Sequence, residues 1–497
     1  MLTQLHQLLD AAINGVNALL WNYVLVALLV LSGIYFTVRF RFVQVRLLGQ
    51  SLRQVVAKAP TDGGISGFQA FTIGLASRVG TGNIAGVAVA LTVGGPGAIF
   101  WMWVISLFGM ASAFVESTLA QIFKVRHRDG SFRGGPAYYI QTGLGSKKIA
   151  VLFSCSLILA FGFVFNAVQA HSIGEAFESS FGWDPLYVGI GLGLMTLPIL
   201  FRGMRGAARI SAIMVPLMAI GYLLMAAYVI VINFALIPEA LGLIVKSAFG
   251  PQQAAGGFAG YAFGAAVLTG VKRGLFTNEA GMGSAPNAAA TASSRHPAQQ
   301  GLLQMLGVSI DTHLICTATA LIILLSGQYT AGTGIQGSAL TQSAIASQVG
   351  SWGGIFMAVA IFFFAYASVI GNYVYAESNF EFLTKNRTAM TVFRLFVAAM
   401  VAFGTVGSLA TIWNLADVSM GLMTIINLVA ICLLGKYALA ALTDYKRRLK
   451  PGAEEPLFTR DTIPALTHLL PSDVWGRKPV APPAERKITQ PVAVVEA

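Results

Sequence analysis

Long apolar segments recur along almost the whole chain, and they constrain its fold more than any other feature. An α-helix of about 17 to 25 apolar residues crosses the roughly 30 Å hydrocarbon layer of a bilayer. Eleven such segments lie near residues 17–38, 67–92, 98–123, 149–173, 185–201, 210–234, 257–276, 299–326, 351–376, 390–410 and 417–437. Of the 497 residues, 56% are hydrophobic and 10% are charged, far from the composition of a soluble globular protein. The sequence therefore predicts an all-α, polytopic membrane protein.

The Lys and Arg residues are concentrated in alternate loops between these segments. If the N-terminus is outside, the inside loops and the C-terminal tail hold 30 of the 32, and only Arg78 and Lys246 lie elsewhere. Cytoplasmic loops of membrane proteins carry such an excess. The pattern predicts an outside N-terminus and a cytoplasmic C-terminus. It assigns the net charge of +12 to membrane topology and excludes nucleic acid as the partner.

The two ends of the chain differ from the apolar core. Residues 1–16 have helical spacing of Leu and Ile but no basic cluster before an apolar core, which favours an interfacial helix over a cleaved signal peptide. Residues 17–66 are predicted to form one extra transmembrane helix and a basic cytoplasmic loop. Residues 441–497 are polar and contain prolines, so a cytoplasmic, largely disordered tail is expected there.

The ten later segments divide into two groups of five, residues 67–234 and 235–440, with opposite predicted orientations. Glycines interrupt the opening segment of each group, near 67–92 and 257–276. Inverted repeats led by such helices are typical of secondary transporters with a site at the bilayer midplane. Glycine also lets membrane helices pack closely, so glycine alone supports the two interpretations about equally.

A polar patch distinguishes the first of these segments from simple packing glycine. Gly80, Thr81, Gly82 and Asn83 lie near its middle. Unwinding there frees amides and carbonyls that lipid cannot satisfy. The amides at the start of the outer half-helix would face a carboxylate, and the carbonyls ending the inner half-helix would face a cation. The patch therefore predicts a site for a zwitterion together with Na⁺.

Three motifs resemble those of a known family. They read ASRVGTGNIAGVAVALTVGGPG, GGPAYYI and VKRGLFTNEAGMGSAPNAAA, within a resemblance that covers about residues 15–440. The chain is similar to the alanine or glycine:cation symporter family, of the amino-acid/polyamine/organocation-type superfamily. That resemblance implies the five-plus-five inverted-repeat fold of the bacterial leucine transporter after one extra helix, with 11 transmembrane helices. It also implies Na⁺-coupled uptake of small neutral amino acids, chiefly alanine or glycine, across the bacterial cytoplasmic (inner) membrane.

The related fold also implies ligands for substrate and ion. The amides of Thr81 and Gly82 would hold the substrate carboxylate. The carbonyls of Ala76 and Val79 and the Ser368 hydroxyl would hold Na⁺. Oxygen ligands of this kind suit a hard monovalent cation.

Further polar residues are expected to line the pocket. Asn166 and Gln169 are three residues apart and therefore lie on one helix face. The resemblance suggests that this face borders the pocket, with Phe163 nearby. An interhelical hydrogen bond is the alternative role for the two amides. Asn372, one turn after Ser368, is predicted to influence the size of the pocket.

Three ionisable residues lie at membrane depth, where a charge costs at least about 2.5 kcal/mol unless it is paired. Arg78 and Glu116 are predicted to form a fixed ion pair between neighbouring helices. Asp311, with His313, is a candidate carrier of a coupled proton, and its role stays open.

Three more charged residues lie near the end of the seventh apolar segment, and we do not assign them to the membrane-embedded site. Lys272, Arg273 and Glu279 are expected to be gate or loop charges and not substrate ligands. The motif TNEAGMGSAP over residues 277–286 has no role that its residues alone reveal.

Two other function classes are less consistent with the sequence. A membrane enzyme would need a catalytic constellation, but the six histidines are scattered without ligand spacing. An ion channel usually repeats its filter around a symmetry axis, whereas inverted halves favour alternating access. Within the transporter class, coupling to H⁺ and a larger substrate such as glutamine or serine are the alternatives.

Overall fold

The computed structural model describes residues 15–57, 63–249, 259–329, 337–407, 409–449 and 455–476. Most of these residues are helical. In chain order the elements are η1 (Leu20–Leu25), α2 (Val26–Arg39), α3 (Val43–Arg46), α4 (Leu48–Val55), α5 (Gly67–Arg78), η2 (Thr81–Asn83), α6 (Ala85–Gly94), α7 (Gly97–Ile122), β1 (Val125–Arg126), β2 (Phe132–Arg133), α8 (Pro136–Gly143), α9 (Lys147–Leu157), η3 (Ile158–Val164), α10 (Phe165–Phe181), α11 (Pro185–Ile232), η4 (Phe234–Leu236), α12 (Ile237–Phe249), α13 (Ala259–Asn278), α14 (Pro286–Thr291), α15 (Pro297–Ser309), η6 (Ile310–Cys316), α16 (Thr317–Leu325), α17 (Ser338–Val349), α18 (Trp352–Leu383), α19 (Arg387–Gly404), α20 (Leu409–Arg448), η7 (Arg460–Thr462) and η8 (Pro464–Leu466). The η elements are 3₁₀ or π turns, and β1 and β2 form an antiparallel hairpin.

Seven helical segments of the described residues are long and apolar enough to cross a membrane. They are Gly97–Ile122, Lys147–Phe181, Pro185–Ile232, Pro297–Leu325, Trp352–Leu383, Arg387–Gly404 and Trp413–Arg448. The 48-residue α11 covers two predicted segments, 185–201 and 210–234. In place of the loop expected between them, the chain has a kink at Gly203, where φ is 62°. The count of eleven and the five-plus-five repeat stay predictions. The interfacial helix expected over residues 1–16 lies almost wholly outside the described residues.

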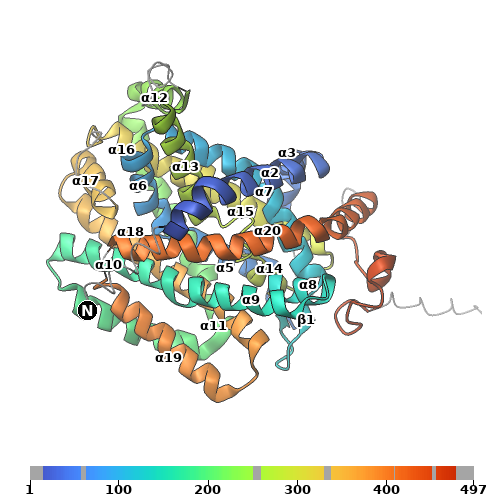
Figure 1. The fold of residues 1–497 in the computed structure, drawn as a ribbon. Helices are drawn as coiled ribbons and strands as arrows, with labels where there is room; N and C mark the ends of the chain where they lie inside the picture. The colour runs from blue at the N-terminus through green and yellow to red at the C-terminus, as the bar shows by residue number, and fades with distance from the viewer. Residues whose placement is uncertain are drawn as a thin grey trace, which may run out of the picture.

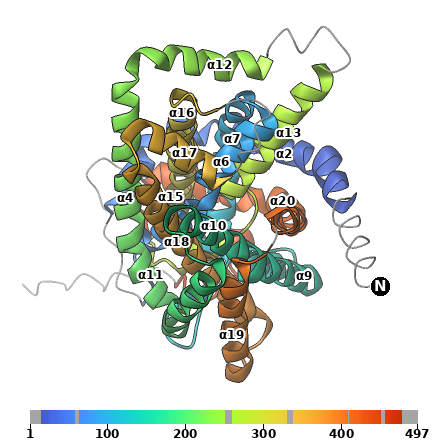
Figure 2. The same cartoon turned by 90° about the vertical axis from the view of Figure 1, so that its left-hand side faces the viewer.

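The long helices pack in two groups that meet at α5. One group contains α6, α7, α13 and α15, in which α7 packs against α13 and α15. The other contains α10, α11, α18 and α19, in which α18 packs against α10 and α11. Figures 1 and 2 show the two groups side by side. Because α5 contacts α11 and α18 of one group and α15 of the other, a movement of α5 would alter its packing against both groups.

The second interrupted helix is broken at a different place from the one predicted. Within its described residues α13 runs through Gly270 and Gly274 without a break. Both glycines press on α7: a Cβ at Gly270 would lie 2.6 Å from the Ala98 carbonyl oxygen. The helix stops instead at Glu279, where φ is 55°, and positive-φ glycines follow. The expected inside loop is therefore a buried break, because its polar groups bond to neighbouring helices.

Ordered structure continues where a largely disordered tail was expected. Residues 455–476 fold back onto the basic end of the molecule, meaning the end that holds β1, α8 and the end of α20 (Figure 1). Trp475 Nε1 donates to the Ile122 carbonyl at 3.0 Å, and its ring lies 5.1 Å from that of Phe458. Both side chains are buried, so the expectation of disorder is wrong for this part. Residues 477–497 lie outside the described part.

We expect Trp475→Phe to loosen this segment. The change keeps an aromatic ring but removes the bond to Ile122, which contributes about 1 kcal/mol. Limited proteolysis of the purified protein should then cut residues 455–476 about fivefold faster. The control is Trp352→Phe, at a ring that is 53% exposed and distant in sequence. Equal cleavage rates in both variants would show that the indole bond does not anchor the segment.

Candidate functional site

The predicted break in the first core helix is present and buried. Val79, with ψ of 80°, and Gly80, with φ of −131° and ψ of −150°, leave the helical conformation after α5. One 3₁₀ turn, η2, then leads into α6. A side chain at Gly80 would place its Cβ 2.2 Å from Ser368 Oγ, so only glycine lets the break lie against α18.

Two main-chain amides of the break, those of Gly80 and Thr81, already have acceptors. The Thr81 amide donates to Gln169 Oε1 at 3.0 Å, and the Gly80 amide donates to Asn83 Oδ1 at 3.0 Å. The Thr81 hydroxyl is buried and has no hydrogen-bond partner in the described part of the chain. A buried hydroxyl without a partner costs free energy. Gln169 Oε1 thus accepts from the Thr81 amide, which is expected from the sequence to hold the substrate carboxylate. The Thr81 hydroxyl beside it is a donor that is still free.

Two of the three predicted cation ligands lie side by side. Ser368 Oγ lies 2.8 Å from the Ala76 carbonyl oxygen and 3.1 Å from that of Phe364. Val79 is outside the helix, so its carbonyl is not committed to the regular α-helical pattern. The Ser368 hydroxyl and the α5 carbonyls therefore place oxygens from two helices at one point.

A chain of buried polar groups connects the two helix breaks. Asn372 Nδ2 donates to Asn166 Oδ1 at 3.1 Å, and Asn372 Oδ1 lies 2.7 Å from the Ser77 hydroxyl. That hydroxyl also lies 2.5 Å from Glu279 Oε1, and the Ser284 hydroxyl donates to Glu279 Oε2 at 2.6 Å. The predicted pocket residues Asn166 and Asn372 are therefore bonded to each other and linked to the second break. Sequence reasoning missed the role of Glu279, because the motif gives no partner by spacing.

The aromatic residue at the break is not the predicted one. Phe163 packs against Phe393, with ring centroids 6.1 Å apart, in a separate apolar cluster. Phe276 instead contacts Gly82, where an added Cβ would lie 2.9 Å from its ring. It also stacks on Phe165 at 4.8 Å. The available signal was an aromatic residue directly before the TNEAGMGSAP motif.

Arg78 and Glu116 do not form the expected direct ion pair. Arg78 Nη1 donates to the carbonyl and to Oε1 of Gln304, both at 3.1 Å. The Glu116 carboxylate accepts the amides of Gly281 at 3.2 Å and Gly283 at 3.1 Å. The prediction of a pair is wrong because the positive-φ glycines of the second break present two amides that satisfy this carboxylate.

Asp311 lies at the first break and not beside His313. It accepts from Asn83 Nδ2 at 2.6 Å and from the Thr312 hydroxyl at 3.0 Å. His313 Nε2 lies 3.2 Å from the Trp103 carbonyl oxygen. Residues two apart on a helix do not face each other, so the two groups point to different neighbours. Asp311 thereby fixes the orientation of the Asn83 amide.

The comparisons with known proteins place these features in a family. The model of the sodium:alanine symporter family matches residues 6–460. The chain belongs to this family. It is 48% identical to the "Probable sodium/glutamine symporter GlnT" of Bacillus subtilis strain 168, over 92% of this chain and 95% of that one. It is 38% identical to the "Sodium/proton-dependent alanine carrier protein" of Bacillus sp. strain PS3, over 82% and 94%.

The fold of this sodium:alanine symporter family member is shared with a solved transporter. The structure described as MhsT in complex with L-phenylalanine matches with a TM-score of 0.52 and 16% identity, over 84% of this chain and 95% of that one. Sodium symport of amino acids is the activity for which the family is named. The chain is therefore a multi-pass membrane transporter of that type.

In this family member Lys272 and Arg273 lie within a helix and not in a loop. Arg273 Nη2 lies 2.8 and 3.0 Å from the two carboxylate oxygens of Asp417, and Lys272 Nζ lies 3.6 Å from one of them. The guanidinium also stacks over Trp413 at 4.5 Å. These charges therefore join α13 to α20.

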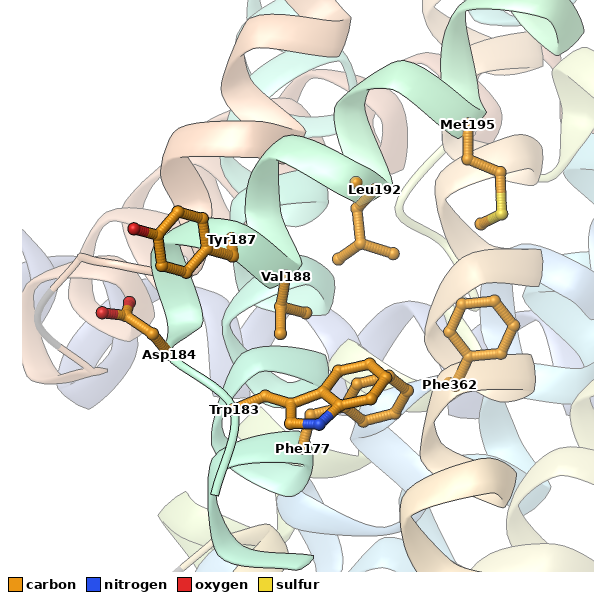
Figure 3. A pocket seen from close by; sticks show the side chains of 9 residues that line it. Phe177, Trp183, Asp184, Tyr187, Val188, Leu192, Met195 and Phe362 are labelled. Carbon is orange, nitrogen blue, oxygen red and sulfur yellow. The ribbon is translucent and has the colours of Figure 1, made fainter. Parts of the chain in front are cut away.

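A cavity of about 560 Å³ lies apart from the break, between α10, α11 and α18. Figure 3 shows Phe177, Trp183, Leu192 and Phe362 around it. Apolar side chains supply most of its wall, and it contains none of the predicted substrate or ion ligands. The polar break is the better candidate for a charged substrate, since a zwitterion needs hydrogen-bonding partners.

Proposed function

We propose that this chain couples Na⁺ entry to the uptake of a small neutral amino acid, alanine or glycine, by alternating access. The protein would lie in the bacterial cytoplasmic membrane with its N-terminus outside and its C-terminus inside. The observation that carries the proposal is the buried break in the first core helix. A free hydroxyl at Thr81 lies on one side of it, and the paired oxygens of Ala76 and Ser368 lie on the other.

The substrate carboxylate is assigned to the amides of Thr81 and Gly82. It would replace Gln169 Oε1 at the Thr81 amide and also accept from the Thr81 hydroxyl, which satisfies a donor that is otherwise unpaired. Phe276 closes the space beside Gly82, and the Asn166 amide group is held by Asn372. A substrate with a short side chain fits between Phe276 and Asn166 better than one with a long side chain.

The cation is assigned to the carbonyls of Ala76 and Val79 and the hydroxyl of Ser368. Oxygen ligands suit Na⁺, and these come from α18, which belongs to one helix group, and from α5, which contacts both groups. An ion held there favours the arrangement in which both helices supply ligands. Binding of Na⁺ and substrate at adjacent points of one break therefore couples the two.

The driving force is sufficient with one ion. One charge moving through about 100 mV provides roughly 2.3 kcal/mol, and a tenfold Na⁺ gradient adds about 1.4 kcal/mol. The sum of roughly 3.7 kcal/mol permits several-hundredfold accumulation.

Transport into proteoliposomes tests the proposal. Uptake of alanine, glycine, serine and glutamine is measured under an imposed Na⁺ gradient or an imposed H⁺ gradient. We expect saturable, concentrative uptake of alanine or glycine that stops when choline replaces Na⁺. Uptake that persists in choline but follows the H⁺ gradient would support the proton-coupled alternative, in which Asp311, bonded to Asn83, is the carrier. Flux that neither saturates nor accumulates substrate would indicate a channel.

Ser368→Ala is expected to weaken the Na⁺ dependence. The change removes one hydroxyl ligand, worth about 1.5 kcal/mol, so the Na⁺ concentration for half-maximal uptake should rise about tenfold. The control is Ser156→Ala, because within the described part of the chain the Ser156 hydroxyl bonds only to the Leu152 carbonyl of its own helix. An unchanged Na⁺ dependence in folded Ser368→Ala would remove this hydroxyl from the ion site.

A further inference from the structure

A second cavity lies at the basic end, between α2, α20 and the segment 455–476. Its volume is about 420 Å³. The residues around it are Arg39, Lys436, Leu439, Ala440, Thr443, Asp444, Arg447 and Thr462. They come from three parts of the chain that are distant in sequence, so the cavity exists only in the folded protein.

The cavity has more positive than negative charge. Arg39 and Lys436 are exposed and lie over the rings of Tyr35 and Tyr437, and no ion pair joins either cation to a carboxylate among the described residues. The one acidic residue, Asp444, is already bonded at 2.9 Å by both Arg447 and Arg448. Two cations thus face the cavity without a counter-ion, which favours an anionic ligand.

An apolar stripe on α20 leads into the cavity. Val429 and Leu433 are 50% and 59% exposed, and Lys436 follows them at helical spacing. The same stripe continues through Thr443 to Arg447. In a bilayer the exposed apolar side chains contact acyl chains, and the basic ones lie at the headgroup level.

The neighbouring helix repeats this arrangement. On α2, Leu31 and Tyr35 are 65% and 42% exposed, and Arg39 follows at the same spacing of four. The two helices touch, since an added Cβ at Gly435 would lie 3.0 Å from the ring of Phe36. Two stripes, each apolar and then basic, therefore run side by side toward one cavity.

We propose that this cavity binds the phosphate group of an anionic phospholipid, whose acyl chains lie along the two stripes. The apolar stripes favour a lipid over a soluble phosphate, because they continue directly from the cations. Bound there, the lipid would connect the extra helix α2, the end of α20 and the C-terminal segment at Thr462. This inference does not rest on the proposed substrate or ion.

Lipid binding to the purified full-length protein tests the proposal. Phosphatidylglycerol or phosphatidylcholine is added to the protein in neutral detergent, and retained lipid is measured by native mass spectrometry alongside the melting temperature. Each cation at an anionic headgroup raises affinity about fivefold. We therefore expect phosphatidylglycerol to bind and stabilise the wild type, and Arg39→Gln with Lys436→Gln to weaken that binding about 25-fold.

Matched variants make the result specific. Lys147→Gln with Lys148→Gln also removes two exposed cations, but outside the cavity, and should bind like the wild type. Arg39→Lys with Lys436→Arg keeps the charge and should retain most binding, which separates charge loss from misfolding. The proposal is overturned if the cavity variant and the Lys147/Lys148 variant bind phosphatidylglycerol equally tightly. It is also overturned if the wild type binds phosphatidylcholine as tightly as phosphatidylglycerol, or if inorganic phosphate alone competes fully with the lipid.

Discussion

Gly80→Ala is expected to abolish concentrative uptake. The new Cβ would lie 2.2 Å from Ser368 Oγ and 2.9 Å from Gln169 Oε1, which belong to two different helices. The φ at this position is negative, so the expected effect comes from the steric clash and not from a left-handed backbone. Overpacking of this kind costs about 1–3 kcal/mol, which reduces the population of an intact site by up to about 100-fold. Uptake in proteoliposomes and stabilisation by Na⁺ should both fall.

Gly86→Ala provides the matched control. Gly86 is buried in α6, and a Cβ there would meet nothing within 4 Å. Alanine also has a higher helix propensity than glycine. This variant should therefore transport like the wild type. If Gly80→Ala transported equally well, the break would not have to press on α18 for the site to work.

Glu116→Ala is expected to cause the largest loss of stability. It removes the acceptor for the Gly281 and Gly283 amides and for Asn427 Nδ2, which donates to Glu116 at 2.8 Å. Buried donors without acceptors cost about 1–3 kcal/mol each. We expect the free energy of unfolding to fall by about 3–5 kcal/mol, measured by thermal unfolding in detergent.

Two other substitutions test whether the loss of stability comes from the missing carboxylate oxygens of Glu116. Glu116→Gln keeps one oxygen acceptor and should lie between the wild type and Glu116→Ala. Glu239→Ala removes an exposed carboxylate at the start of α12 and should change the melting temperature little. If Glu116→Ala melted like Glu239→Ala, the carboxylate would not hold the second break in place.

The two breaks act together in the proposed mechanism. Ser77, one residue before the end of α5, lies between Asn372 of α18 and Glu279 of the second break. A shift of either break changes the distances in this chain. The polar chain therefore provides a physical link between the substrate amides and the helix that carries Glu279.

The sequence determined the features that depend on local composition. Long apolar runs must be helical in lipid, since only internal hydrogen bonding satisfies their backbone. The glycines and polar residues at 80–83 predicted the break correctly, because a run of small and polar residues is costly to keep as a lipid-facing helix. The motifs also indicated the family that the comparison over residues 6–460 shows.

Only the tertiary structure decided the partners of the buried polar groups. Glu116 bonds to the 281 and 283 amides and not to Arg78, and Phe276 in place of Phe163 meets the break. Spacing along one helix shows which face a residue occupies, but it does not show which residue of another helix faces it. The second break and the folded segment 455–476 depend on the same long-range contacts, so they could be recognised only in the assembled molecule.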